Sequence, residues 1–173
     1  MAEHSSCYTV VGAGPAASAA VDGIREHDPQ GSILLIGAEA DPPYDRPPLS
    51  KQLWSGAKQL EELFLHNRAF YAQHGVELRL GTEVVALDPA AHVLRDSGGA
   101  SYRYKKLLIA TGGAPRRLAI PGGDLEGVSY FRTMDDYRRL RSAASAGKSA
   151  LVIGGGVVGP EVWAGLRIQG GAG

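Results

Sequence analysis

Two glycine-rich segments have the spacing that lets a protein backbone approach phosphate groups. One follows the pattern Gly-x-Gly-x-x-Ala and the other follows Gly-x-Gly-x-x-Gly. Their defining residues are Gly12, Gly14 and Ala17 in the first segment and Gly154, Gly156 and Gly159 in the second. In such a pattern the first glycine permits a tight turn, the second lets a pyrophosphate come close, and the third small residue lets a helix pack against a strand. Two copies in one chain predict two dinucleotide sites, for which a flavin and a nicotinamide cofactor are the obvious pair.

The residues around the first glycine segment predict a strand, a helix and a second strand. Residues 8–11 are β-branched or aromatic, residues 15–26 are rich in alanine, and residues 32–36 form a continuous apolar run. Pro15 suits the first turn of a helix, where its missing N–H leaves no bond unmade. The apolar run is typical of a parallel strand that is buried on both faces. We therefore expect one βαβ unit here.

An acidic residue follows the second predicted strand. Glu39 stands where the acid of a dinucleotide-binding unit binds the ribose hydroxyls, a little beyond the spacing of about 20 residues that is usual for that acid. Two simpler interpretations stay open. The glycine segment can be a purely structural turn, and Glu39 can be an ordinary surface acid.

The rest of the chain predicts further short strands and therefore an α/β protein. Strand-like runs occur at residues 76–80, 84–87, 93–95, 101–104 and 107–110. Thr133 predicts the cap of a helix that reaches residue 146. A strand at 149–153 and a helix at 160–168 are expected on either side of the second glycine segment. We expect an FAD-binding Rossmann-like fold with a small β-meander insertion, followed by the first βα unit of a second Rossmann domain.

Composition and charge argue against several other classes of protein. Because 18 basic residues balance 18 acidic ones, bulk electrostatics cannot drive binding to nucleic acid or an acidic membrane. The one cysteine, Cys7, cannot form an intrachain disulfide or a dithiol redox centre, and the five histidines lack metal-ligand spacing. Residues 8–21 are the longest apolar stretch, which is shorter than the roughly 20 residues that a membrane span needs. We expect a cytoplasmic protein without a metal site.

A proline-rich loop gives the chain a specific family resemblance. The loop reads Pro43-Tyr44-Asp45-Arg46-Pro47-Pro48-Leu49-Ser50-Lys51. Together with the first glycine segment and the run Ala110-Thr111-Gly112-Gly113, it resembles the FAD-dependent pyridine nucleotide reductases, in particular their ferredoxin-reductase and apoptosis-inducing-factor branch. The resemblance implies that NAD(P)H passes hydride to FAD, which then passes electrons to an iron–sulfur protein or another acceptor. The implied partners are a ferredoxin, a rubredoxin or a Rieske-type protein.

The resemblance also implies which residues hold the two cofactors. The FAD pyrophosphate is expected at Gly12, Gly14, Pro15, Ala16 and Ala17, and again near Ala110, Thr111 and Gly112. Glu39 is expected to bind the adenosine ribose, and the Val84 backbone is expected to contact the adenine. The nicotinamide nucleotide is expected at Gly154, Gly156, Val157 and Gly159, with Val157 lining the flavin face that receives hydride.

Four charged residues are implied to act near the phosphates and the flavin ring. Arg46 is expected to reach the phosphates and Arg132 the flavin. Lys51 is expected beside the ring, where a cation stabilises the negative charge that develops near N5. Glu161 is expected to face the Lys51 ammonium, which makes these two residues the candidate catalytic pair. Each of the three cations can instead be a solvated surface residue.

The chain is shorter than the plan that the resemblance implies. We expect residues 1–120 to form the N-terminal segment of an FAD-binding domain, and residues 121–173 to form a linker and an incomplete start of an NAD(P)-binding domain. We expect about the last 50 residues to pack poorly and to expose apolar side chains. Three alternatives stay open: a catalytically incomplete FAD-binding fragment, a binding protein like apoptosis-inducing factor without redox activity of its own, and a dehydrogenase with a single NAD site.

Overall fold

The computed structural model describes residues 3–144 and 148–168 of the chain. It divides into two compact units. Unit 1 comprises residues 1–45 and 64–112, and unit 2 comprises residues 46–63 and 113–173.

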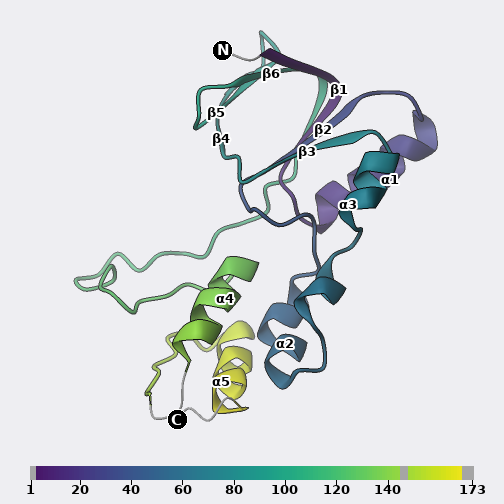
Figure 1. Cartoon of the computed structure of the whole chain (residues 1–173). Helices are drawn as coiled ribbons and strands as arrows, with labels where there is room; N and C mark the ends of the chain where they lie inside the picture. Colours follow the sequence, from purple (N-terminus) through teal and green to yellow (C-terminus); the bar gives the residue numbers. More distant parts are fainter. Residues whose placement is uncertain (1–2, 145–147, 169–173) are drawn as a thin grey trace. The chain divides into compact units, whose positions relative to one another are not determined.

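Unit 1 is built on a six-stranded mixed sheet with the strand order β3-β2-β1-β6-β5-β4 (Figure 1). Strands β1 (Glu3–Val11), β2 (Ile33–Gly37), β3 (Val76–Leu80) and β6 (Ser101–Ile109) are parallel to their neighbours in this group. Strands β5 (Val93–Asp96) and β4 (Val84–Asp88) continue the sheet in antiparallel fashion. The predicted Rossmann-like sheet with a β-meander is therefore present.

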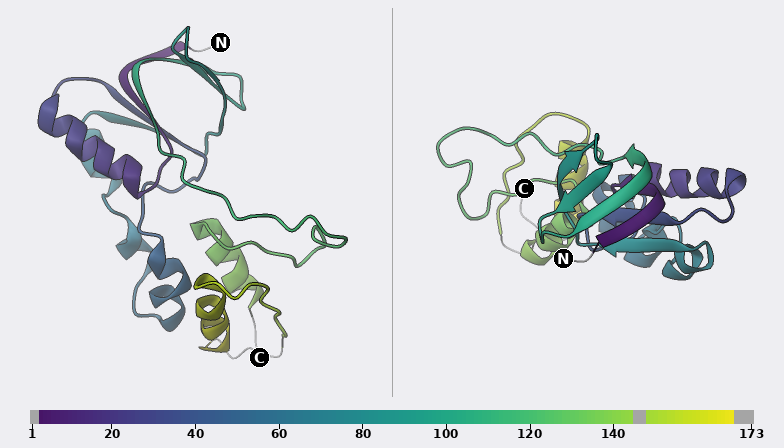
Figure 2. Two further views of the ribbon diagram at one scale, coloured as in Figure 1. Left: turned by 180° about the vertical axis from the view of Figure 1, so that it is seen from behind. Right: turned by 90° about the horizontal axis from the view of Figure 1, so that it is seen from above.

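Both faces of β2 are buried, as its continuous apolar sequence predicts. Ile33 and Leu35 join the core with helices α1 (Pro15–His27) and α3 (Arg68–Gln73). Leu34 and Ile36 face the opposite way and pack with Tyr102 and its neighbours on the meander side. Figure 2 shows α1 and α3 together beside the parallel strands. Side chains alternate along a strand, so only an apolar residue at every position suits two buried faces.

Strand β6 is one nine-residue strand, whereas the sequence predicted two short strands separated by Lys105 and Lys106. The strand pairs with β1 along its length, but β5 reaches only its first residues. Both lysines are exposed, and the Lys106 ammonium lies 5.4 Å from the centre of the Tyr8 ring on the paired strand. A cation can stand in this part of the strand because its stem covers apolar surface while its charged end reaches solvent.

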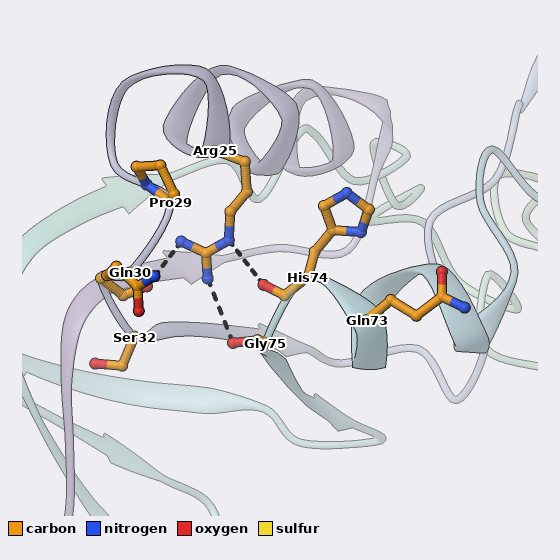
Figure 3. A pocket seen from close by; sticks show the side chains of 8 residues that line it. Arg25, Pro29, Gln30, Ser32, Gln73, His74 and Gly75 are labelled. Carbon is orange, nitrogen blue, oxygen red and sulfur yellow. Dashed lines mark hydrogen bonds between the residues drawn. The ribbon is translucent and has the colours of Figure 1, made fainter.

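Arg25, near the end of α1, binds the turn between α3 and β3 by hydrogen bonds to backbone carbonyls (Figure 3). Its Nε donates to the His74 carbonyl at 2.7 Å, and its Nη1 donates to the carbonyls of Asp28 and Gly31 at 2.9 and 2.8 Å. An open cavity of about 610 Å³ lies beside these groups. Since the guanidinium is occupied by carbonyls, we assign Arg25 to the fold and not to a ligand.

Unit 2 is helical and packs around Trp54, which is 1% exposed. Its elements are η1 (Pro47–Ser50), α2 (Gln52–Ser55), η2 (Leu60–Leu63), α4 (Met134–Ala143) and α5 (Val158–Ile168). Tyr137 of α4 meets the Trp54 ring edge-on with 5.3 Å between ring centres. Gly165 of α5 lies so close that a Cβ there would be 2.5 Å from the same ring. One indole therefore brings α2, α4 and α5 together.

Helix α4 begins where the sequence predicts and ends earlier. Thr133 caps it in a capping box with Asp136. The helix ends at Ala143, and most of the expected extension to residue 146 lies outside the described residues.

The strand expected at residues 149–153 is absent from the described part of the chain, and that prediction is wrong. Leu151 and Ile153 are 87% and 72% exposed. An apolar strand forms only when neighbouring strands bind its backbone and cover its side chains, and no named strand pairs with these described residues. The expected exposure of apolar side chains near the end of the chain is confirmed for the described residues, because Leu125, Val157 and Ile168 are also exposed. The expected poor packing does not hold for α4 and α5, whose Met134, Tyr137 and Val162 are buried.

Helix α1, with 13 residues, is longer than α4 and α5. Among the described residues, no helix has both the length and the apolar character needed to cross a membrane.

Candidate functional site

The first glycine turn joins three strands of unit 1. Gly12 has φ +118°, which L side chains rarely adopt, and its N–H donates to the Ile36 carbonyl at 2.7 Å. A Cβ on Gly12 would lie 2.1 Å from the Ala110 carbonyl oxygen. The Ala110 N–H, just after β6, donates to the Val11 carbonyl at the end of β1 at 2.7 Å. Glycine is therefore required at position 12 by both backbone conformation and space.

The start of α1 is open toward solvent and suited to an anion. No atom lies within 4 Å of a Cβ built on Gly14. Gly14 is the N-cap and has no side chain to occupy the first N–H groups, and the first turn contains no acidic residue. The positive end of the helix dipole thus has neither a capping side chain nor an acid in the first turn of the helix. Ala17 is fully buried and lets the helix pack on the sheet. These residues fit a pyrophosphate.

Glu39 lies just beyond β2 and is held by neighbouring groups. The Tyr44 hydroxyl donates to Glu39 Oε2 at 2.5 Å, and the Gly81 N–H donates to the Glu39 carbonyl at 2.9 Å. Sequence reasoning missed Tyr44, although it belongs to the proline-rich loop that carried the family resemblance. It also missed Gly37, where a Cβ would lie 2.4 Å from the Ala13 Cβ.

The other residues predicted for FAD in unit 1 lie at strand ends. Val84 starts β4 and packs at the edge of the meander-side core. Thr111 and Gly112 follow β6 and are exposed, and Gly112 has φ +70°. The structure brings Ala110 against the first glycine turn, but the cofactor contacts of these residues stay predictions.

In unit 2 the structure brings Lys51 and Glu161 together. Lys51 Nζ lies 3.5 Å from Glu161 Oε1, with 49% and 22% of the two side chains exposed. Lys51 stands at the junction of η1 and α2, and Glu161 stands in the first turn of α5. This contact is the arrangement that the family resemblance implied for the pair. Its role beside a flavin stays a prediction.

Ser50 binds the second oxygen of the same carboxylate. Its hydroxyl donates to Glu161 Oε2 at 2.6 Å, and only 7% of Ser50 is exposed. A cavity of about 190 Å³ adjoins this group. Its lining residues are Ser50, Lys51, Trp54, Glu161, Ala164, Gly165 and Ile168. Nothing in the sequence pattern singled out Ser50, because its partner stands at the other end of the chain.

The two arginines predicted near the cofactor also meet within unit 2. Arg46 Nη1 donates to the Arg132 carbonyl at 3.2 Å, and the Arg132 N–H donates to Asp136 Oδ2 at 3.0 Å. Burial opposes ionisation of Asp136, but hydrogen bonds from the Thr133 N–H and hydroxyl, the Arg139 guanidinium and the Arg132 N–H together outweigh it and lower the pKa of that carboxyl. The carboxylate thus holds the backbone that carries Arg132.

The second glycine segment forms its turn without the strand that was expected before it. Gly154 has φ +126°, and a Cβ on Gly159 would lie 2.4 Å from the Gly154 carbonyl oxygen. Gly156 has open space where its Cβ would stand, and Val157 is 77% exposed. The three glycines therefore meet the steric demands of the pattern.

The parallel sheet, the glycine turn and the uncovered helix start define an α/β protein of the dinucleotide-binding class. The chain belongs to the pyridine nucleotide-disulphide oxidoreductase family, whose model matches residues 7–170. The single cysteine of this chain, Cys7, lies on β1, so the chain cannot carry a dithiol pair of its own.

Two curated relatives illustrate the similarity. The rubredoxin-NAD(+) reductase of Pseudomonas putida is 37% identical over 153 residues, which are 88% of this chain and 40% of the relative. The ferredoxin–NAD(+) reductase component of the biphenyl dioxygenase system of Paraburkholderia xenovorans (strain LB400) is 40% identical over 88% of this chain and 37% of its own length. The chain thus spans about two fifths of these relatives.

Solved structures show the same likeness in three dimensions. The covalent complex of putidaredoxin reductase with putidaredoxin contains a chain that superposes with a TM-score of 0.85 at 31% identity. The match covers 96% of this chain and 40% of that one.

Proposed function

We propose that this chain binds FAD and forms the flavin-binding part of an NAD(P)H reductase of the ferredoxin-reductase type. In this proposal residues 1–120 form the N-terminal segment of the FAD-binding domain, and residues 121–173 begin the NAD(P)-binding domain. The acceptor is an iron–sulfur or rubredoxin-type protein, in line with the names of the relatives. In this proposal the reaction takes place in the cytoplasm. When bound, FAD would supply the redox chemistry, which is the transfer of electrons from NAD(P)H to the acceptor.

The observation that carries the proposal is the contrast between Gly12 and Gly14. Gly12 is packed against the Ala110 carbonyl and cannot hold a side chain, whereas Gly14 opens onto free space at the start of α1. A purely structural turn needs the first property alone. The second property, at a helix start without a capping side chain or an acid, is what a pyrophosphate requires.

The other residues of unit 1 complete the proposed FAD contacts. Ala16 and Ala17 continue the helix start, and the Glu39 carboxylate binds the adenosine ribose. Val84 contacts the adenine through its backbone. Ala110, Thr111 and Gly112 leave space beside the pyrophosphate because two of them have small side chains or none.

The charged residues of unit 2 supply fixed charge. Lys51 stabilises negative charge on the flavin ring through its ammonium, and Glu161 keeps that ammonium in place by the contact at 3.5 Å. Arg46 pairs with phosphate oxygens, and Arg132 contacts the flavin. Gly154, Gly156 and Gly159 hold the nicotinamide nucleotide, and the exposed Val157 lines the nicotinamide side.

Titration of the purified chain with FAD tests the proposal directly. We expect bound flavin in the visible spectrum, and bleaching when NADH or NADPH is added without oxygen. Gly14→Ala should weaken FAD binding because a methyl group enters the phosphate space. Gly23→Ala is the matched control, since it makes the same change within the helix that Gly14 caps, and its methyl group meets no atom within 4 Å beyond its chain neighbours and the backbone of that helix. Equal FAD affinity of the two variants would refute the pyrophosphate assignment.

A second candidate is a flavin-binding chain without redox activity of its own. It is favoured by the missing strand at residues 149–153, where Leu151 is 87% exposed. The nicotinamide site then lacks the sheet that normally supports its glycine turn. Bound flavin that neither NADH nor NADPH bleaches would support this second candidate over the first.

A further inference from the structure

We infer that Ser50 is a positioning residue that orients the Glu161 carboxylate toward Lys51. The inference rests on the proposed function, because it concerns the pair proposed to act beside the flavin. Ser50 and Lys51 are consecutive in the chain, yet they bind different oxygens of one carboxylate. The Ser50 hydroxyl donates to Oε2 at 2.6 Å, and the Lys51 ammonium lies 3.5 Å from Oε1.

The two contacts differ in strength and rigidity. A hydroxyl–carboxylate bond of 2.6 Å has the length of a charge-assisted hydrogen bond, whereas the lysine contact is longer and half exposed. The Lys51 stem has four rotatable carbons and cannot hold its partner in place. Ser50 is buried in η1, and its short side chain turns about one bond only. The rigid partner of Glu161 is therefore Ser50, and Lys51 meets an oxygen whose direction Ser50 has set.

The surroundings explain why a short side chain is suited to this position. Glu161 lies in the first turn of α5, and the same helix packs on Trp54 through Gly165. The backbones of α5 and η1 are thus held close, and a serine spans the remaining distance. When the Ser50 hydroxyl is removed, Glu161 Oε2 loses its hydrogen bond, and the carboxylate can turn away from Lys51 toward the adjoining cavity.

The test uses the signal of the Lys51 side chain in the cofactor-free protein. The five lysines of the chain are converted to ¹³C-dimethyl-lysines, which keep their charge, and their methyl resonances are recorded by NMR. Lys51→Arg identifies the Lys51 resonance, and Glu161→Gln shows its position without the ion pair. We expect Ser50→Ala to move this resonance most of the way to the Glu161→Gln position, and Ser50→Thr to leave it near the wild-type position. The resonances of Lys105 and Lys106 on β6 report whether unit 1 is unchanged.

A Lys51 resonance that stays at its wild-type position in Ser50→Ala would overturn the inference. If Ser50→Ala does not fold, Ser50→Cys provides the same comparison, because it keeps the volume and offers only a weak donor. The experiment contains no FAD, so its result is independent of whether the chain binds flavin. Failure of the FAD titration would refute the proposed function and leave the Ser50 result standing.

Discussion

Lys51 Nζ lies 3.5 Å from Glu161 Oε1, although η1 and α5 are separated by most of the chain. The contact joins the last residue of the proline-rich loop to the helix that follows the second glycine segment. Since half of Lys51 is exposed, the pair is worth only about 0.2–1 kcal/mol to folding. The importance of the pair would lie in fixing the position of the Lys51 ammonium.

The first prediction concerns this pair. Lys51→Ala and Glu161→Ala should each weaken FAD binding and slow flavin reduction by NADH, and the double variant should lose no more than Lys51→Ala alone. A double-mutant cycle on both quantities measures the coupling. Lys58→Ala, a change of another lysine of unit 2, is the control and should combine additively with Glu161→Ala. Additive losses from Lys51→Ala and Glu161→Ala would show that the two residues act separately.

The second prediction separates the structural glycine from the binding glycine. Gly12→Ala should lower the free energy of unfolding by about 2 kcal/mol or more, because φ is +118° and the new methyl group meets the Ala110 carbonyl. Gly14→Ala should lower it by less than about 1 kcal/mol, because Gly14 has φ −105° and open space. Urea unfolding followed by circular dichroism distinguishes the two, and equal losses of stability would contradict the assignment.

Sequence reasoning predicted β1, β2 and α1 because their signals are local. The apolar run that became β2 and the Gly12 turn need only their own residues to be recognised. The strand at 149–153 was predicted from the same kind of apolar run, and the prediction failed. An apolar run indicates that a segment can form a buried strand. Whether the strand forms depends on neighbouring strands elsewhere in the chain that bind its backbone.

The candidate site shows the same division between local and distant signals. Gly12, Gly14 and Glu39 were found from spacing, and Lys51 and Glu161 from a family resemblance. Ser50 was missed because its partner, Glu161, is 111 residues away in the sequence. Tyr44 was missed although Glu39 is only five residues away, because a hydrogen bond between two loop residues follows no regular spacing. Hydrogen bonds that position a candidate site carboxylate do not follow a regular spacing in the sequence.

The third prediction concerns Arg25. Arg25→Lys should lower the free energy of unfolding by about 1–3 kcal/mol, because a lysine cannot reproduce the fork of bonds to the carbonyls of His74, Asp28 and Gly31. Figure 3 shows the bond to the His74 carbonyl. Arg68→Lys, at an exposed position of α3, is the matched control and should change stability little. If the two variants unfold at the same urea concentration, the hydrogen bonds of the Arg25 guanidinium do not contribute to stability.

The fourth prediction is that folding stability depends on pH through Tyr102, a residue of the meander. Burial, together with the Asp96 carboxylate that accepts its hydrogen bond at 2.6 Å, raises the pKa of Tyr102 to about 12. The folded state therefore holds this proton more tightly than the unfolded state, where the ordinary pKa is 10. The contribution to stability is complete below pH 10 and is lost as the pH rises toward about 12.

Ultraviolet difference titration of the wild type against Tyr102→Phe measures this group alone. The difference should titrate near pH 12 in the folded protein and near pH 10 in urea. Asp96→Asn should lower the folded midpoint because it removes the charge that opposes phenolate formation. A folded midpoint near 10 in the wild type would contradict the prediction.

The last prediction concerns Tyr44 and the acid it holds. Tyr44 is 1% exposed, and its hydroxyl donates to Glu39 Oε2 at 2.5 Å. Tyr44→Phe should keep the packing and remove one restraint on Glu39, so that FAD affinity falls roughly three- to tenfold. Affinity for flavin mononucleotide, which lacks the adenosine ribose, should not change. Tyr8→Phe is the matched control, because the Tyr8 hydroxyl donates to Asp28 beyond the far end of α1. If Tyr44→Phe and Tyr8→Phe bind FAD equally well, Glu39 does not depend on Tyr44 for its position.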